Sequence, residues 1–207
     1  MARAPRPGAG KTRLRPRLGA DGCARLQAAL LERTLRLACR FAPGDVHLAL
    51  DGSYPTAVPA RRLVQRGADL GERMRHAVGE VTGSRPRPVL VIGTDAPTLS
   101  ERQLSAAAAA LCDDDVVLGP ALDGGYYLAG VRGPSAADAV FAIESGLWGG
   151  PDVLAASRKA AVRAGLRVSL LEPLRDLDTP ADVDALLADD CLPPELTALL
   201  QPVAARA

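Results

Sequence analysis

The chain has little of what marks several large classes of protein. Aromatic residues make up 3% of its 207 residues, and no hydrophobic run approaches the length of a membrane-spanning helix. Its four cysteines lie far apart and form no C-x-x-C pair; they are Cys23, Cys39, Cys112 and Cys191. This spacing excludes a cysteine zinc site and a disulfide framework, and it predicts reduced thiols in a cytoplasmic protein.

Net charge is also small. The formal charge of +1 excludes a strong overall attraction to nucleic acid or to an anionic membrane. The hydrophobic content of 48% over 207 residues is enough for one domain with a substantial core. We therefore expect a globular protein that acts on small molecules, with neither nucleic acid nor membrane as a partner.

Lysine is the rarest charged residue. Of the 25 basic residues only Lys11 and Lys159 are lysines, and the other 23 are arginines. Lys11 follows the sequence Pro-Gly-Ala-Gly, whose glycines let backbone N–H groups approach phosphate oxygens. A compact ammonium suits a crowded phosphate. We predict a phosphate-binding loop, with a solvated N-terminal segment as the alternative.

The loop shares Gly-Lys-Thr with the Walker A motif of P-loop NTPases. That motif has a glycine where this chain has Pro5, and an apolar strand comes directly before it. Only residues 1–4 precede the loop here, and Arg3 interrupts them. A P-loop-like NTPase is therefore a less favoured alternative.

Strand and helix patterns alternate along the chain. This alternation predicts an α/β layered fold with a mainly parallel sheet. The strongest strand, 88–93, is continuously apolar and is expected at the centre of the sheet. The other expected strands are 46–50, 62–65, 116–119, 126–131 and 166–171, and the expected helices are 21–41, 70–81, 100–111, 135–141, 152–164 and one that opens at Thr179-Pro180.

Aspartates follow several of these strands. Asp95 comes directly after strand 88–93, where a carboxylate next to a phosphate loop is a natural Mg²⁺ ligand. Asp176 and Asp178 lie on one side of an extended segment and are candidates for the same cation. The alternatives are a turn at Asp95 and a helix cap at 176–179, with Asp182 serving the helix dipole. Residues 123–127 have the sequence Asp-Gly-Gly-Tyr-Tyr, whose glycines, carboxylate and aromatic rings predict a substrate pocket or, alternatively, a hairpin turn.

Taken in order, five segments resemble the GT-A nucleotide-diphospho-sugar-transferase superfamily and, within it, the DUF2064 group of glycosyltransferase-like or "transferase 1" proteins. The segments span nearly the whole chain. They are Ala4-Pro-Arg-Pro-Gly-x-x-Lys-Thr-Arg-Leu14, Ala68-Asp-Leu-Gly-Glu-Arg-Met74, Ile92-Gly-Thr-Asp-Ala-Pro-Thr-Leu99, Leu118-Gly-Pro-x-x-Asp-Gly-Gly-Tyr-Tyr-Leu128 and Asp176-x-Asp-Thr-Pro-x-Asp182.

The resemblance implies a single-domain Rossmann-like GT-A fold with helices on both faces of the sheet. Residues 1–190 would form the nucleotide-binding transferase domain and 191–207 a helical tail. Lys11 and Asp95 would be the catalytic residues, and Mg²⁺ or Mn²⁺ the cofactor. By role, the expected residues are Gly8, Gly10, Lys11 and Arg13 at the phosphates, Gly71 near the base, Asp95 with Asp178 or Asp176 at the metal, and Asp123, Gly124, Gly125 and Tyr126 near the acceptor.

Two reactions fit these residues. The first is nucleotidyl transfer from an NTP to an acidic acceptor with pyrophosphate release, which the lysine-bearing loop favours. The alternative is glycosyl transfer from an NDP-sugar donor. A further alternative is a nucleotide-binding protein without turnover.

The chain departs from the group before the loop, where the group has an apolar first strand. Residues 1–4 are too short and too polar to fill the central place of that strand in the sheet. We hypothesise that the chain is an N-terminally shortened version of the working protein. We then expect either a gap one strand wide beside loosely anchored residues 1–13, or another segment in that gap.

Overall fold

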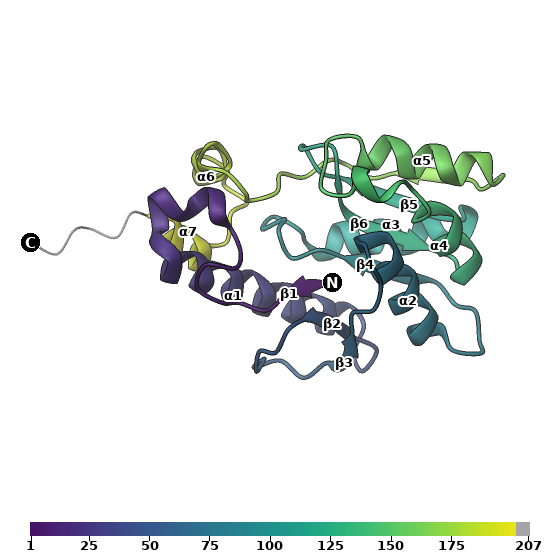
Figure 1. Ribbon diagram of the computed structural model, residues 1–207, viewed down its shortest axis with the longest axis horizontal. Coiled ribbons are helices and arrows are strands. Elements are labelled where there is room, and N and C mark those ends of the chain that lie inside the picture. Colours follow the sequence, from purple (N-terminus) through teal and green to yellow (C-terminus); the bar gives the residue numbers. More distant parts are fainter. Residues whose placement is uncertain (202–207) are drawn as a thin grey trace, which may run out of the picture.

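The computed structural model describes residues 1–201 and contains two sheets flanked by helices (Figure 1). The first sheet is parallel and has the order β1-β2-β3. The second has the order β4-β6-β5-β7, and β6 runs antiparallel to both of its neighbours. The strands are β1 (Ala2–Arg3), β2 (His47–Asp51), β3 (Arg61–Val64), β4 (Val89–Ile92), β5 (Val116–Pro120), β6 (Tyr126–Val131) and β7 (Val168–Leu170).

Seven α-helices lie within the described residues. They are α1 (Arg15–Phe41), α2 (Leu70–Thr82), α3 (Glu101–Asp113), α4 (Pro134–Val140), α5 (Val153–Arg163), α6 (Pro180–Leu187) and α7 (Pro194–Leu200). Short 3₁₀ turns cover Thr12–Leu14 and Ser145–Leu147. The predicted α/β fold is therefore confirmed. No helix within residues 1–201 is both long and apolar enough to cross a membrane.

Helices cover both faces of the second sheet, as expected. Val116 and Leu118 of β5 pack into one core cluster with residues of α2, α4 and α5. Val117, between them, belongs to a second cluster with residues of α3. Successive side chains of a strand point to opposite faces, so a strand buried on both sides is apolar throughout.

Helix α1 begins six residues before the predicted start at residue 21. Gly19 has a φ of 69° inside this helix and marks a kink. Only the part after the kink has the uninterrupted helical pattern that the sequence shows, which is why the first turn was missed. Leu18, before the kink, and Leu14, directly before α1, pack into a cluster with residues of α6 and α7.

Strand β4 differs from its prediction as a central parallel strand. It pairs antiparallel with β6, and no described strand pairs with its other edge. On that edge the Met1 amino group donates a hydrogen bond of 2.9 Å to the Ile92 carbonyl oxygen. A cavity lined partly by residues of β2 and β4 lies beside this edge. Residues 1–13 are nevertheless anchored, because Ala2 and Arg3 form β1 and pair with β2.

The last helices pack against the start of the chain, at the end of the molecule opposite β4–β7 in Figure 1. Leu177, Leu186 and Leu196 share a cluster with Leu26 of α1. The predicted tail, 191–207, includes α7 and its contact with α1. Residues 202–207 of that tail lie outside the described part of the chain.

We predict that Leu177→Ala lowers the free energy of unfolding by about 2–5 kcal/mol, because Leu177 is fully buried in the cluster that joins α1 to α6 and α7. The matched control is Leu170→Ala, because the Leu170 side chain is 44% exposed. Urea unfolding measures the free energy of unfolding of both variants. If Leu177→Ala lost no more of this free energy than Leu170→Ala, the result would contradict a stabilising role of the cluster.

Candidate active site

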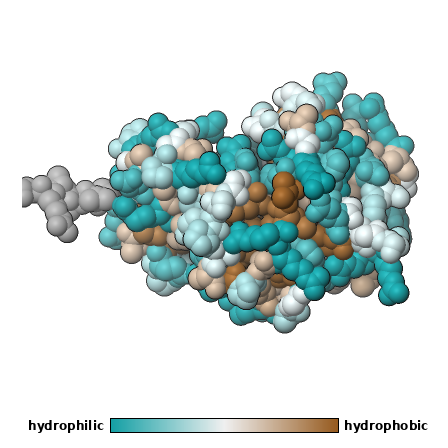
Figure 2. Space-filling model, turned by 60° about the horizontal axis from the view of Figure 1, so that its bottom comes forward, coloured by the Kyte–Doolittle hydropathy of each residue, from teal (hydrophilic) through white to brown (hydrophobic). Residues whose placement is uncertain are grey.

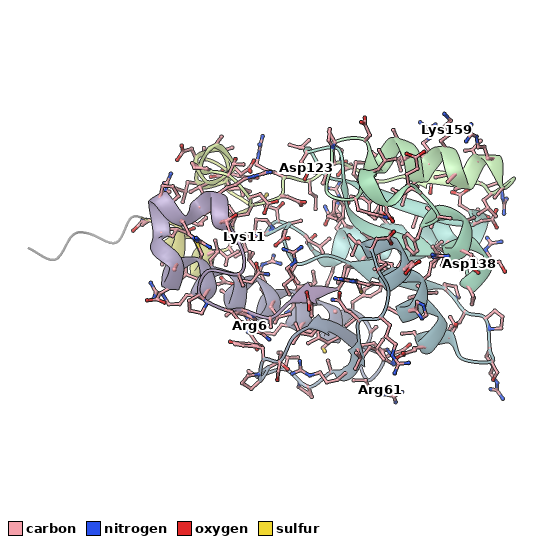
Figure 3. All side chains as sticks on the ribbon, viewed as in Figure 1. Arg6, Lys11, Arg61, Asp123, Asp138 and Lys159 are labelled. Carbon is pink, nitrogen blue, oxygen red and sulfur yellow. The ribbon has the colours of Figure 1, made fainter. Side chains whose placement is uncertain are left out.

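A cleft of about 700 Å³ lies at the carboxyl ends of β1, β2 and β4. This is the edge at which open α/β sheets bind ligands, and the volume is typical of small-molecule sites. Nine predicted site residues line it, namely Gly10, Lys11, Arg13, Asp95, Asp123, Gly125, Tyr126, Asp176 and Asp178. Lys11, in the loop before α1, and Asp123, between β5 and β6, are labelled in Figure 3.

The centre of the cleft is an ammonium group between two carboxylates. Lys11 Nζ lies 2.6 Å from Asp95 Oδ1 and 2.8 Å from Asp178 Oδ1. It also donates a hydrogen bond of 2.8 Å to the Leu177 carbonyl oxygen. The Lys11 side chain is 3% exposed, whereas the two carboxylates are about two-fifths exposed. The structure thus brings Asp95 and Asp178 together, as expected, with Lys11 directly on them.

Burial alone would lower the pKa of Lys11. The charges of Asp95 and Asp178, and the hydrogen bonds to them, outweigh burial and raise the pKa above its usual value. Lys11 is therefore a permanent cation at neutral pH. Its ammonium offsets the repulsion between two carboxylates that share a site.

The backbone of Lys11 is in the left-handed region, with a φ of 50°. Within residues 1–201 no other non-glycine residue has a positive φ. Such a conformation is unfavourable for a side chain with a β-carbon and persists only where surrounding contacts fix it. Here Leu14 N–H and the Cys23 thiol both donate to the Lys11 carbonyl oxygen, at 2.9 and 3.4 Å.

A backbone hydrogen bond joins the two acidic segments. Leu177 N–H donates to the Asp95 carbonyl oxygen at 2.8 Å, which ties the segment after β7 to the loop after β4. Asp182 accepts hydrogen bonds from the backbone N–H groups of Asp178 and Thr179, and forms a capping box with Thr179. Thr179 is therefore the N-cap of α6, and Asp182, in the first turn as predicted, completes the capping box and fixes the backbone at Asp178.

Asp176 contributes a further, half-buried carboxylate. Its Oδ1 atom has no hydrogen-bond partner. Burial, followed by the negative charges of Asp95, Asp123 and Asp178, raises the pKa of Asp176 to about 7. A cation in the cleft would satisfy this oxygen and relieve the repulsion.

The cleft as a whole carries more acidic than basic side chains. Its acidic residues are Asp51, Asp69, Asp95, Asp123, Asp176 and Asp178, and its basic residues are Arg3, Lys11, Arg13 and Arg73. Within residues 1–201 no three His, Cys, Asp or Glu side chains are close enough to form a complete metal site. Mg²⁺ needs only one or two carboxylates when phosphate oxygens and water supply the rest. The donor set therefore fits a metal that arrives with a phosphate-bearing ligand.

Three predicted site residues do not line the cleft: Gly8, Gly71 and Gly124. Gly8 lies in the loop before α1, and its carbonyl oxygen accepts a hydrogen bond from the Arg15 side chain. Gly71 lies against the Phe141 carbonyl and the Trp148 ring, so close that a β-carbon would collide with both. Gly124, with a φ of 93°, approaches the Pro151 carbonyl in the same way. Gly71 and Gly124 therefore allow close packing beside the cleft, which their neighbours Leu70, Asp123 and Gly125 line.

Trp148 lines the cleft but was not among the predicted site residues. It packs edge to face on Tyr126, with ring centroids 6.5 Å apart. Trp148 is the only tryptophan in the chain and is followed by two glycines, a signal that could have marked it. Gln27 and Thr94 were also missed; both line the cleft, and they are hydrogen-bonded to each other at 3.3 Å.

Asp176→Asn should remove a pH dependence of stability. The pKa of Asp176 is near 7 when folded and about 3.9 when unfolded, so the folded protein holds this proton more tightly. Stability of the wild type should fall as pH rises from 4 to 7 in metal-free buffer. We expect Asp176→Asn to gain about 3 kcal/mol relative to wild type between pH 4.5 and pH 8.

Urea unfolding at the two pH values measures this difference. The control is Asp138→Asn, because Asp138 is exposed on α4, away from Lys11 (Figure 3). If the difference in stability between wild type and Asp176→Asn did not change with pH, this result would contradict a raised pKa of Asp176 in the folded protein.

Comparisons with known proteins agree with this fold and cleft. The family model described as "Uncharacterized protein conserved in bacteria (DUF2064)" matches residues 25–146. A crystal structure from Desulfovibrio desulfuricans G20, described as a "putative nucleotide-diphospho-sugar transferase", superposes with a TM-score of 0.80 at 30% identity. The match covers 96% of this chain and 94% of that one. No curated protein matches. The chain belongs to the DUF2064 family.

Proposed function

We propose that the protein is a divalent-metal-dependent transferase that uses a nucleoside-diphosphate sugar as donor and a small molecule as acceptor. The observation that carries this proposal is the Asp95–Lys11–Asp178 cluster at the carboxyl edge of the sheet. The description of the similar structure as a nucleotide-diphospho-sugar transferase supports the choice of donor. Mg²⁺ or Mn²⁺ is the cofactor that suits this set of oxygen donors.

The charge of the cleft explains why a metal is needed. A diphosphate would meet an excess of carboxylates over basic groups, so binding without a further cation is unfavourable. Asp95 and Asp178 would hold the metal, with Asp176 beside them. When bound, the metal would neutralise the charge that develops on the departing diphosphate.

The remaining cleft residues divide into two groups by their chemistry. Arg3, Arg13 and Arg73 offer guanidinium groups for phosphate oxygens. Asp123 and the Tyr126–Trp148 pair form the second group. A carboxylate and an aromatic surface suit a hydroxyl-bearing ring, and we assign these residues to the sugar and acceptor. Catalysis then consists of positioning and charge neutralisation.

Nucleotidyl transfer from an NTP to an acidic acceptor is the second candidate. The loop ending in Gly10-Lys11 favours it, because such a loop suits a departing pyrophosphate. This reaction requires Lys11 to reach phosphate oxygens. In the structure three protein oxygens already lie within 2.8 Å of the ammonium, so the geometry favours the sugar donor.

Thermal-shift measurements with NDP-sugars and NTPs, each with and without Mg²⁺, test the proposal. We expect an NDP-sugar with Mg²⁺ to raise the melting temperature by about 5–10 °C at a hundredfold excess over Kd. Asp95→Asn should lose this Mg²⁺-dependent shift, whereas the exposed Asp138→Asn should keep it. NDP release in the presence of acceptors then confirms turnover. A shift with NTPs alone, with pyrophosphate release, would favour the second candidate.

Lys11→Ala separates the two candidates further. If Lys11 grips the triphosphate, calorimetry should show a loss of about 1–3 kcal/mol in NTP binding, the scale of one charged hydrogen bond. Lys159→Ala is the matched control, because Lys159 is the other lysine and lies exposed on α5, away from the cleft (Figure 3). Unchanged affinity of Lys11→Ala for every ligand would remove Lys11 from the binding site.

A further inference from the structure

The charges of the cleft are divided along the chain. Its basic side chains all come from residues 1–73, the part of the chain that forms the first sheet and begins α2. From residue 93 to the end of the described chain, no lysine or arginine lines the cleft. The aspartates that line it there are Asp95, Asp123, Asp176 and Asp178. The later part of the chain therefore contributes only negative charge to the cleft.

Three of these four carboxylates have a cation assigned to them. Asp95 and Asp178 lie 2.6 and 2.8 Å from Lys11 Nζ. Under the proposed function, the same two aspartates hold a divalent metal with Asp176 beside them. Lys11 and the metal together carry three positive charges, which match the three negative charges of these aspartates. Asp123 is left without a counter-charge.

The other acidic residues of the cleft are already compensated. Asp51 lies opposite Arg3 in the register of β1 and β2. Asp69 accepts the Glu72 N–H at the N-terminus of α2, where the helix dipole favours a negative charge. Asp123, in contrast, accepts only the neutral Gly125 N–H, at 2.9 Å, and forms no salt bridge within residues 1–201.

The turn that carries Asp123 is held against the segment that carries Trp148. Gly124 lies so close to the Pro151 carbonyl that a β-carbon would collide with it, and the Gly124 carbonyl oxygen accepts the Leu154 N–H at 3.0 Å. Three residues before Pro151, Trp148 packs on the ring of Tyr126. Asp123, Tyr126 and Trp148 therefore form one group whose backbone is fixed before any ligand binds.

A carboxylate near a tyrosine and a tryptophan has the chemistry that recognises an ammonium group. The carboxylate accepts charge-assisted hydrogen bonds from the ammonium, and the aromatic rings attract its positive charge. A neutral hydroxyl gains neither of these charge interactions. A ligand carboxylate would be repelled by Asp123 and by the other aspartates of the cleft.

We propose that Asp123, Tyr126 and Trp148 bind an ammonium group of the acceptor. The acceptor is then an amine-bearing hydroxyl compound, of which amino sugars are the simplest class, and neither a neutral sugar nor an acid. The ammonium is held by Asp123, and a hydroxyl of the same molecule remains free for transfer. This inference rests on the proposed function, and it disfavours the acidic acceptor of the second candidate.

A second cavity, of about 390 Å³, is lined mainly by aliphatic residues of α1, β2 and β4 and their neighbours. Hydrophobic residues also gather in the middle of the face shown in Figure 2. The acidic residue of this cavity, Asp45, is already paired with Arg87, at 2.6 and 2.9 Å. An ammonium ligand finds no unpaired carboxylate there, so its binding reports on the cleft.

Trp148 fluorescence measures binding at this group, because Trp148 is the only tryptophan in the chain. Glucosamine, glucose and glucuronate carry similar rings with a positive, a neutral and a negative charge. Each is titrated at pH 6, where the amine is protonated, in Mg²⁺ alone and in Mg²⁺ with an NDP. We expect glucosamine to bind about tenfold more tightly than glucose, the scale of one charged hydrogen bond, and glucuronate to bind most weakly.

Asp123→Asn removes the charge but keeps an oxygen that can accept the Gly125 N–H. We expect this variant to bind glucosamine and glucose with equal affinity. The matched control is Asp138→Asn, because Asp138 is exposed on α4 and does not line the cleft. This control should retain the preference for glucosamine.

Three results would overturn the proposal. They are equal affinity of the wild type for glucosamine and glucose, no response of Trp148 to glucosamine, and a preference for glucosamine that Asp123→Asn retains. The last result would assign the ammonium to Asp95, Asp176 or Asp178. The titrations in Mg²⁺ alone need no donor, so they test this inference separately from the proposed function, which fails if no NDP-sugar raises the melting temperature.

Discussion

The structure depends on one buried cation held between two carboxylates. Lys11 Nζ lies within 2.8 Å of oxygens from Asp95, Asp178 and Leu177. These residues belong to the loop before α1, the loop after β4 and the segment after β7. A single ammonium therefore joins three parts of the chain that are distant in sequence. Removing it would leave the partly exposed carboxylates of Asp95 and Asp178 close together with no counter-charge between them.

The same balance of charge explains how the cleft can select its ligand. One ammonium does not offset Asp95, Asp178 and the half-buried Asp176, whose raised pKa reflects the surplus of negative charge. A ligand with phosphates alone would add to that surplus. A metal–diphosphate complex brings a cation to the carboxylates and anionic oxygens to the arginines. Under the proposed function, the cleft would therefore bind a metal and a diphosphate together more tightly than either one alone.

Much of this arrangement could be predicted from the sequence because it follows from local patterns. The alternation of strand and helix patterns predicted the α/β fold. Because Asp95 and Asp178 follow strands in the sequence, both were expected at one edge of the sheet, where they line the cleft. The contact of Lys11 with carboxylates was not predicted, because a sequence shows the residue type and not the oxygens it meets. The packing of Trp148 on Gly71 was not predicted either, because it depends on tertiary contacts.

Strand β4 illustrates the other limit of sequence reasoning. Its continuous apolar pattern records burial on both faces, but it does not record which strand lies beside it. In the structure one edge pairs with β6 and the other faces the cavity behind Met1. The early start of α1 was missed for a simpler reason, because Gly19 interrupts its helical pattern.

The most direct measurement of the central ion pair uses the scarcity of lysine. With ¹⁵N-labelled lysine, NMR should show side-chain signals from Lys11 and Lys159 alone. The account predicts a Lys11 ammonium signal that is protected from exchange at neutral pH, titrates above the Lys159 signal, and shifts when Mg²⁺ and the nucleotide ligand are added together. A Lys11 signal that exchanges and titrates like that of exposed Lys159, and ignores metal and nucleotide, would contradict it.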